Sequence, residues 1–178
     1  MEGSAGMMIT ASHNPKDDNG VKIIEHNGDV LPVSWEPFAE QIVNSTNLEE
    51  TLVDIFDKLE RKYKFRDTEF LPNAPQLVSF GYDTRVSGER LVKVAMKAVQ
   101  TMGLKFVLFG QVTTPQLHWL VEQSYREPAD AQEYVKNWNA RFSDFISLCE
   151  SQEGFEPRKN YQEQMILDCA NGIGTKWI

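Results

Sequence analysis

The sequence predicts an α/β fold, in which a mixed sheet is packed between helices. Two short runs rich in apolar residues, 76–81 and 106–109, are each followed by a segment with helical spacing or a helix-start signal. Near the N-terminus, a third run, 7–10, is followed by a fourth, 21–24, which we expect to return beside it as a neighbouring strand. Strands that alternate with helices in this way are typical of a largely buried sheet.

Turn and capping signals define the elements of the N-terminal part. Asn27-Gly28 follows the second strand and is a frequent turn dipeptide. Ser34 is expected to cap a helix whose apolar face holds Trp35, Phe38, Ala39, Ile42 and Val43. Asn47 and Glu50 resemble a capping box that opens a second helix, with Leu52, Ile55, Phe56, Leu59 and Tyr63 on its apolar face. Residues 70–75, bounded by prolines, are predicted to be a connector.

The same signals define the central elements. The strand at 76–81 leads to a helix that Ser87 is expected to cap and that Gly103 ends. After the next strand, Thr114 precedes Pro115, and proline is favoured at the first position of a helix. We therefore predict that a further helix begins there.

The C-terminal part is predicted to contain a long helix and the start of a second domain. The apolar residues of this helix are Tyr134, Trp138, Phe142, Phe145 and Ile146. Residues 150–160 are polar and are the expected domain linker, whereas 164–169 read as a strand that enters the glycine turn 170–174. We therefore expect a first domain at 1–155 and a truncated second domain at 156–178, because the last strand has no helix to cover it.

Composition excludes some functional classes. The net charge of −8 argues against a nucleic-acid-binding protein that neutralises phosphates. No apolar run approaches the roughly 18 residues of a membrane span, so no membrane partner is expected. Two widely spaced cysteines, Cys149 and Cys169, are expected to be buried thiols in a reducing compartment, which favours a cytoplasmic location. The oligomeric state stays open.

The hexapeptide Thr10–Pro15 is the most informative motif. Phosphoryl transfer needs an acceptor oxygen, positive charge around the phosphate, and a group that moves the hydroxyl proton. Ser12 offers the oxygen, while His13 and Lys22 can donate hydrogen bonds to phosphate oxygens. Asn14 favours a tight turn that exposes the serine. From residue types alone, an ordinary polar turn between two strands is the alternative.

Thr10–Pro15, with Lys22 ten residues after Ser12, resembles the phosphoserine loop of the α-D-phosphohexomutases. Three further segments resemble other parts of these enzymes, in order along the chain: 81–88 (a G-x-D-x-R-x-S pattern), 113–118 and 168–174. The serine loop precedes the Asp83–Arg85 segment, an order similar to that of the phosphoacetylglucosamine mutase family. The resemblance implies domain 1 of the phosphohexomutase fold plus the start of domain 2.

The resemblance also implies an activity and a set of site residues. The family interconverts N-acetylglucosamine 6-phosphate and N-acetylglucosamine 1-phosphate through a phosphoserine and a bisphosphorylated sugar, towards UDP-N-acetylglucosamine. Its substrate is an amino-sugar phosphate and its cofactor is Mg²⁺. Ser12 is then the catalytic phosphoserine and a metal ligand. His13, Lys22 and Arg85 are further catalytic residues, and Asn14 and Lys22 bind substrate.

Departures from the family pattern leave alternatives open. The chain has no Asp-Gly-Asp run of the kind that supplies the other Mg²⁺ ligands in the family. We therefore expect negligible mutase activity from these 178 residues alone, and an inactive interaction module is the alternative function. A serine hydrolase is disfavoured because no G-x-S-x-G motif is present. His118 is expected to be a structural histidine.

Overall fold

The computed structural model describes residues 4–11, 13–63, 77–124, 129–152 and 166–177. A four-stranded sheet has the order β2-β1-β3-β4. Its strands are β1 (Ser4–Ile9), β2 (Val21–Ile24), β3 (Leu77–Tyr82) and β4 (Lys105–Gln111). β1, β3 and β4 run parallel, whereas β2 pairs antiparallel with β1. The prediction of a mixed α/β sheet, with residues 21–24 returning beside the first strand, is confirmed.

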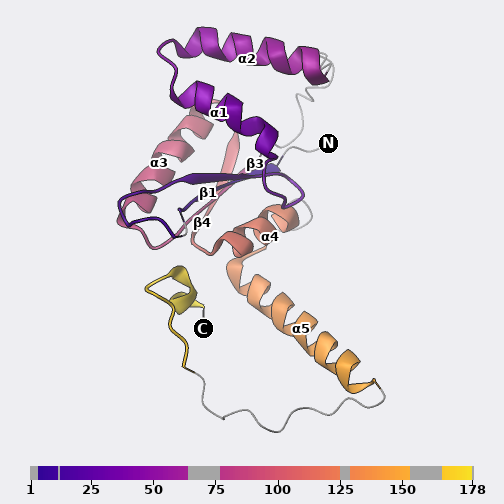
Figure 1. The fold of residues 1–178 in the computed structure, drawn as a ribbon. Helices are drawn as coiled ribbons and strands as arrows, with labels where there is room; N and C mark the ends of the chain where they lie inside the picture. The colour runs from indigo at the N-terminus through magenta and orange to yellow at the C-terminus, as the bar shows by residue number, and fades with distance from the viewer. Residues whose placement is uncertain (1–3, 12, 64–76, 125–128, 153–165, 178) are drawn as a thin grey trace.

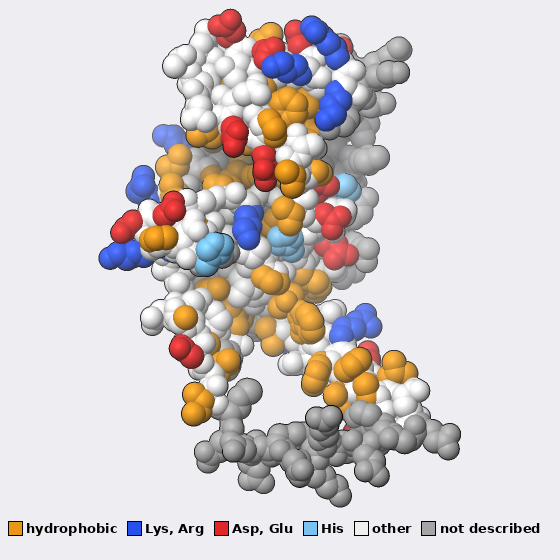
Figure 2. All heavy atoms as spheres, viewed as in Figure 1, with side chains coloured by type: hydrophobic (Ala, Val, Ile, Leu, Met, Phe, Trp, Pro, Cys, Tyr) orange, Lys and Arg blue, Asp and Glu red, His pale blue; other side chains and the backbone are white. Residues whose placement is uncertain are grey.

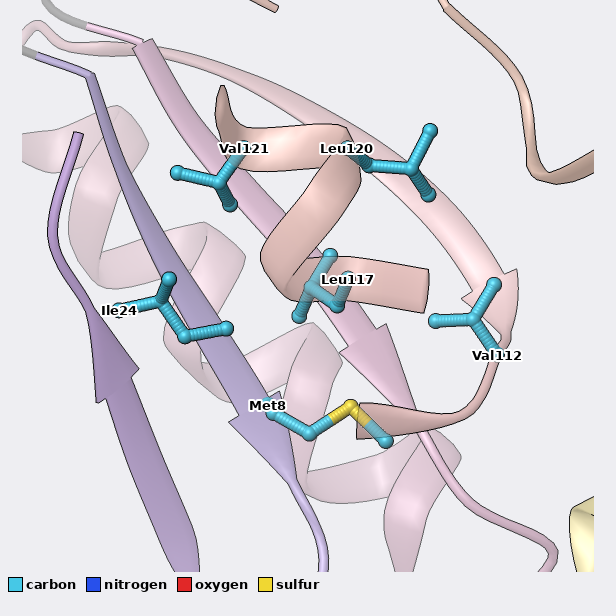
Figure 3. Close-up of a cluster of buried hydrophobic side chains, with 6 residues drawn as sticks. All are labelled: Met8, Ile24, Val112, Leu117, Leu120 and Val121. Carbon is cyan, nitrogen blue, oxygen red and sulfur yellow. The ribbon is translucent and has the colours of Figure 1, made fainter. Parts of the chain in front are cut away.

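Helices cover both faces of this sheet (Figure 1). Their bounds are α1 (Glu36–Val43), α2 (Leu48–Tyr63), α3 (Val86–Thr101), α4 (Thr114–Ser124) and α5 (Ala131–Glu150), with short 3-10 turns at Val33–Trp35 and Ile173–Lys176. On one face, Ile9 and Phe80 pack against Val92 and Val99 of α3. On the other face lies a second buried cluster: Met8, Ile24, Val112, Leu117, Leu120 and Val121. Figure 3 shows these six side chains gathered between α4 and the strands.

The close approach of α4 to the sheet depends on a glycine in β3. A Cβ atom on Gly81 would lie 2.6 Å from Cγ2 of Val112 and 3.2 Å from Cδ2 of Leu117. Any side chain at this position would overlap Val112, because two carbon atoms closer than 3 Å repel each other. Helix α4 therefore packs close to the sheet, and its N-terminal end lies at the carboxyl edge of the strands.

Two predicted caps, Ser34 and Ser87, differ in the structure. Ser34 lies inside the 3-10 turn, and α1 begins after Trp35 without a side-chain cap. Helix α3 is preceded by Arg85, also without a side-chain cap, and Ser87 instead accepts a hydrogen bond from Asn19 at 2.9 Å. Each serine lies one or more residues inside its helical segment, so its hydroxyl is not placed to receive the first free N–H groups.

At α4 the predicted start is off by one residue. Thr113 and Gln116 form a reciprocal capping box: the Thr113 N–H donates to Oε1 of Gln116 at 2.7 Å, and the Gln116 N–H donates to Oγ1 of Thr113 at 3.3 Å. The capping box predicted at Asn47 is found, since the Glu50 N–H donates to Oδ1 of Asn47 at 3.4 Å. Helix α2 buries Ile55 and Leu59, but Phe56 is exposed.

Three predicted segments remain: the connector at 70–75, the linker at 150–160 and the strand at 164–169. The connector at 70–75 lies outside the described residues, as does most of the linker at 150–160. Ile166–Cys169, the described part of the predicted strand 164–169, form no strand. A strand needs a hydrogen-bonding neighbour, and no described strand pairs with these residues. The boundary between domains 1–155 and 156–178 stays a prediction.

Gly103 ends α3 as predicted, and it offers a test of local backbone strain. Its φ is +74°, its N–H donates to the Gln100 carbonyl at 3.0 Å, and the Leu104 N–H donates to the Val99 carbonyl at 3.2 Å. This is a Schellman arrangement, which needs a left-handed residue. We expect Gly103→Ala to lower the free energy of unfolding by about 1 kcal/mol.

Urea denaturation measures this loss. Gly174→Ala is the matched control, because Gly174 has no positive φ and open space around its Cα. An equal effect of the two substitutions would contradict the proposed strain at Gly103.

Candidate functional site

The candidate site lies at the carboxyl edge of the sheet, where β1 and β3 end side by side. Thr10 follows β1 and Asp83 follows β3, and both are buried. The Thr10 hydroxyl donates to Oδ2 of Asp83 at 2.8 Å. Ligand sites of α/β sheets commonly lie at this edge, because loops from neighbouring parallel strands meet there.

Arg85 completes a network around the Asp83 carboxylate. Its backbone N–H donates to Oδ1 of Asp83 at 2.9 Å, and its guanidinium forms an ion pair with Oδ2 of the same carboxylate. The other arm of the guanidinium donates to the Asn14 carbonyl at 2.8 Å. The side chains of Asp83 and Arg85 are only 10% and 11% exposed, so little solvent weakens this ion pair.

The loop that contains the hexapeptide, residues 11–20, is fixed at several points and is called the serine loop below. At its base the Thr10 N–H donates to the Gly20 carbonyl at 3.0 Å. Near its tip the Asn14 N–H donates to the Ala11 carbonyl at 2.9 Å, which forms the predicted turn. The Asn19 amide donates to the Ser87 hydroxyl and so joins the loop to α3. Ser12 itself lies outside the described residues.

A hollow of about 540 Å³ opens beside the serine loop and is called the loop hollow below. It is lined by Thr10, Asn14, Lys16, Asp83, Thr84, Arg85, Val86, Thr114 and the segment 170–173. Two cationic side chains, Lys16 and Arg85, therefore border one hollow together with hydroxyl and amide groups. Such a lining suits an anionic ligand such as a phosphate ester.

The segment 170–173 forms one wall of the loop hollow. Oγ1 of Thr84 donates to the Asn171 carbonyl at 3.3 Å, and Lys176 donates to the Gln111 carbonyl at 3.4 Å. Ala170 and Asn171 have left-handed backbones, with φ of 46° and 59°. Residues at the far end of the sequence therefore take part in the candidate site, although the described part of the predicted strand 164–169 is not a strand.

The structure brings together some of the predicted site residues. Asn14 and Arg85 line the loop hollow and are joined by a hydrogen bond. His13 is exposed on the turn of the serine loop and does not line the hollow. Lys22 lies on β2 opposite Met8 and is exposed. Because paired residues on neighbouring strands point to one face, Lys22 lies on the face of the sheet that α4 covers, near the base of the serine loop.

Sequence reasoning did not select several residues that the structure places in the site. Thr10, Lys16, Asp83, Thr84 and Asn171 all line the loop hollow. One local signal pointed to Asp83. An Asp side chain commonly accepts a hydrogen bond from the backbone N–H two residues later, which here is the N–H of Arg85. The long-range contacts of Asp83 with Thr10, and of Thr84 with Asn171, had no local signal.

The described residues do not form a magnesium site by themselves. Within the described ranges, no three His, Cys, Asp or Glu side chains are grouped closely enough to hold a metal ion. The Asp83 carboxylate, which lines the loop hollow, already accepts hydrogen bonds from Thr10 and Arg85. The described residues therefore do not fit Mg²⁺, and its binding through a phosphate on Ser12 stays a prediction.

Two other predictions concern His118 and membrane-spanning helices. Nδ1 of His118 lies 2.6 Å from the Gly28 carbonyl, which holds α4 against the turn after β2 and agrees with a structural histidine. This contact borders a second hollow, formed by residues 27–29 and α4. Among the described helices, none has the length and apolar character that crossing a membrane requires.

Comparison with known proteins identifies the family. The family model "Phosphoglucomutase/phosphomannomutase, alpha/beta/alpha domain I" matches residues 1–50 and 66–131. This chain belongs to that family. The resemblance to the α-D-phosphohexomutases, and the fold of their first domain, are confirmed.

Individual relatives are phosphoacetylglucosamine mutases. The chain is 38% identical over 177 residues to that of Arabidopsis thaliana, covering 98% of this chain and 31% of the relative. It is 33% identical over 175 residues to that of Homo sapiens, covering 96% of this chain and 30% of the relative. The chain thus spans about a third of the length of these curated relatives.

Solved structures give the same result. A crystal structure described as N-acetylglucosamine-phosphate mutase in its substrate complex matches with a TM-score of 0.72 and 29% identity, over 98% of this chain and 31% of that chain. The Aspergillus fumigatus N-acetylphosphoglucosamine mutase in complex with GlcNAc-6P and magnesium matches with a TM-score of 0.55 and 34% identity, over 72% and 23% of the two chains.

Proposed function

We propose that this chain provides the phosphoserine-bearing domain of a phosphoacetylglucosamine mutase, which interconverts N-acetylglucosamine 6-phosphate and N-acetylglucosamine 1-phosphate. The observation that carries the proposal is the attachment of the serine loop to the carboxyl edge of the sheet by Arg85, which bridges Asp83 and the Asn14 carbonyl. The relatives named above, which have this activity in their names, support it.

In the proposed reaction, Ser12 carries a phosphoryl group and transfers it to the free hydroxyl of the sugar phosphate. The bond from phosphorus to the serine oxygen breaks as the bond to the sugar oxygen forms, and the product is a bisphosphorylated sugar. Return of the other phosphoryl group to Ser12 then regenerates the phosphoserine and releases the isomeric monophosphate. The two transfers balance without any other phosphate donor.

The described side chains suit particular roles in this reaction. Lys16 and Arg85 border the loop hollow and offer positive charge to a phosphate. Because Arg85 also donates to the Asn14 carbonyl, its charge stays fixed relative to the turn that contains Ser12. Lys22 is proposed to move the proton of the sugar hydroxyl, as the family resemblance implies.

Two further predictions remain: the protein is cytoplasmic, and the 178 residues alone have negligible mutase activity. The second has a physical reason, because the described residues include no group of three His, Cys, Asp or Glu side chains that could hold a metal ion. Electrostatic stabilisation and orientation are each commonly worth several kcal/mol in phosphoryl transfer.

Phosphate uptake tests the proposed function. The chain is incubated with glucose 1,6-bisphosphate and Mg²⁺, its intact mass is measured, and the modified peptide is mapped. We expect a gain of one phosphate on Ser12 when the chain is joined to the remaining part of a mutase relative, and negligible gain for the chain alone. Absence of any gain in the joined form, once that form is shown to be folded, would contradict the proposal. A gain in the chain alone would show that the domain is sufficient for phosphate uptake.

The alternative, an inactive interaction module, is favoured by a separate observation. Exposed hydrophobic side chains gather on α5 (Figure 2), and no residue of this helix lines the loop hollow. The role of this surface does not depend on the activity of Ser12.

A further inference from the structure

Both limbs of the serine loop are attached to the start of α3, which lies beside the loop (Figure 1). On the limb near the tip, the Asn14 carbonyl accepts a hydrogen bond from the Arg85 guanidinium at 2.8 Å. On the returning limb, the side-chain amide of Asn19 donates to Oγ of Ser87 at 2.9 Å. Arg85 directly precedes α3, and Ser87 is the second residue of the helix. One helix start therefore holds the loop at two points.

The side chain of Asn19 uses both of its polar groups to fix the returning limb. While its amide donates to Ser87, its Oδ1 accepts the N–H of Gly20 at 2.9 Å. The Gly20 carbonyl in turn accepts the Thr10 N–H at 3.0 Å, and a Cβ atom on Gly20 would lie 3.2 Å from the Thr10 carbonyl oxygen. The returning limb is therefore packed closely against the end of β1, next to the residue that reaches across to α3.

Between these attachment points the loop is hydrogen-bonded to itself. The Asn14 side-chain amide donates to Oδ2 of Asp18 at 3.2 Å, and the Asp18 N–H donates to the Pro15 carbonyl at 3.0 Å. The loop therefore behaves as one unit. A unit held at its base and at one further point can rotate about the line that joins them, and a third contact removes this rotation. The bond from the returning limb to α3 is that third contact.

The hydroxyl of Ser87 serves the loop and not its own helix. In the described structure α3 follows Arg85 with no side-chain cap, so the Ser87 hydroxyl does not receive the free N–H groups of the first turn. The described residues that line the loop hollow include neither Asn19 nor Ser87, and both side chains are half-buried. Their contact therefore affects a reaction at the hollow only through the position of the loop.

We propose that Asn19 and Ser87 are positioning residues, whose hydrogen bond holds the serine loop in the orientation in which Ser12 transfers phosphate. The inference rests on the proposed function, since the two side chains act through the loop on that same transfer. It adds a second support on α3 to the one that Arg85 provides. Phosphoryl transfer is sensitive to such support, because a misplacement of about 1 Å can lower a rate about a hundredfold.

Rates of phosphate uptake from glucose 1,6-bisphosphate test this role, in the chain joined to the remaining part of a mutase relative. We expect Ser87→Ala to lower the maximal rate about tenfold or more, while the bisphosphate concentration that gives half the maximal rate stays within about twofold of the wild type. The split is expected because the hydroxyl that is removed does not line the loop hollow. A purely structural role would leave both quantities unchanged at a temperature where circular dichroism shows the variant to be folded.

Two comparison variants separate the hydroxyl of Ser87 from a general effect on α3. Ser87→Thr keeps a hydroxyl on the same Cβ atom and should restore most of the rate. Thr101→Ala removes a hydroxyl from the opposite end of the same helix, where it donates to the Lys97 carbonyl at 2.9 Å. This control should leave the rate unchanged.

A double substitution shows whether the two side chains act as a pair. Ser87→Ala should slow uptake little when Asn19→Ala is already present, because the interaction between them is then already lost. The position of the loop has its own measurement. Trypsin should cleave faster after Lys16 in Ser87→Ala than in the wild type, without a matching rise in global unfolding measured with urea.

Failure of this inference is distinguishable from failure of the proposed function. A wild-type joined chain that takes up no phosphate would contradict the proposed function and this role with it. Wild-type uptake together with an unchanged maximal rate in Ser87→Ala would overturn the positioning role alone, as would independent effects of the two alanine substitutions. A change confined to the half-saturating concentration would also overturn it, because the two side chains would then act in substrate binding.

Discussion

Substitution of Ser12 by alanine is expected to abolish phosphate uptake completely in the chain joined to the remaining part of a mutase relative. The reason is chemical, because alanine has no oxygen to accept the phosphoryl group. Positive charge and turn geometry at the site cannot replace that oxygen. Intact-mass measurement after incubation with glucose 1,6-bisphosphate and Mg²⁺ gives the result directly.

The matched control for this prediction is Ser34→Ala, which removes an exposed hydroxyl from the 3-10 turn before α1. This variant should take up phosphate as the wild type does. Phosphate that still appears in the Ser12→Ala protein would show that another side chain is the acceptor, and peptide mapping would locate it. The stability of both variants should match the wild type, so that loss of uptake is not loss of folding.

Asp83→Ala is expected to destabilise the fold by about 3 kcal/mol, because loss of one partner of a largely buried ion pair leaves the other charge uncompensated. The Asp83 carboxylate accepts hydrogen bonds from Thr10 and from the Arg85 backbone, and it pairs with the Arg85 guanidinium. All three donors lose their acceptor at once. Urea denaturation at constant protein concentration measures the change.

Two further variants serve as comparisons: one removes an exposed carboxylate elsewhere, and the other removes only the charge of Asp83. Asp54→Ala removes an exposed carboxylate that pairs with Lys58 on α2, and it should change stability by less than about 1 kcal/mol. Asp83→Asn keeps an acceptor oxygen for Thr10 but loses the charge, so its cost should fall between the two. Equal costs for Asp83→Ala and Asp54→Ala would contradict the assigned role of the network.

The same network predicts the behaviour of the serine loop. When Asp83 is removed, Arg85 is no longer held in place to donate to the Asn14 carbonyl. Trypsin should then cleave faster after Lys16, which lies two residues beyond Asn14 on the exposed loop. Cleavage that rises only in proportion to global unfolding would show that the loop is not held by this contact.

Most elements of the fold were predictable from the sequence, because their signals are local. Hydrophobic runs located the strands, and Gly103 and Asn47 marked the end of α3 and the start of α2. The caps at Ser34 and Ser87 were wrong because a serine close to a helix start does not fix which residue is the cap. The strand predicted at 164–169 is absent from its described part, because a strand also needs a neighbour that local sequence does not specify.

The sequence by itself determined that a serine-containing turn follows a buried strand and that the chain belongs with the phosphohexomutases. Only the tertiary structure decided that Asp83, seventy-three positions from Thr10, accepts its hydroxyl proton in a hydrogen bond and holds Arg85 at the serine loop. It also decided that Asn171 lies beside Thr84. The physical reason is that such contacts depend on which strands become neighbours, and that choice is made by packing of the whole sheet.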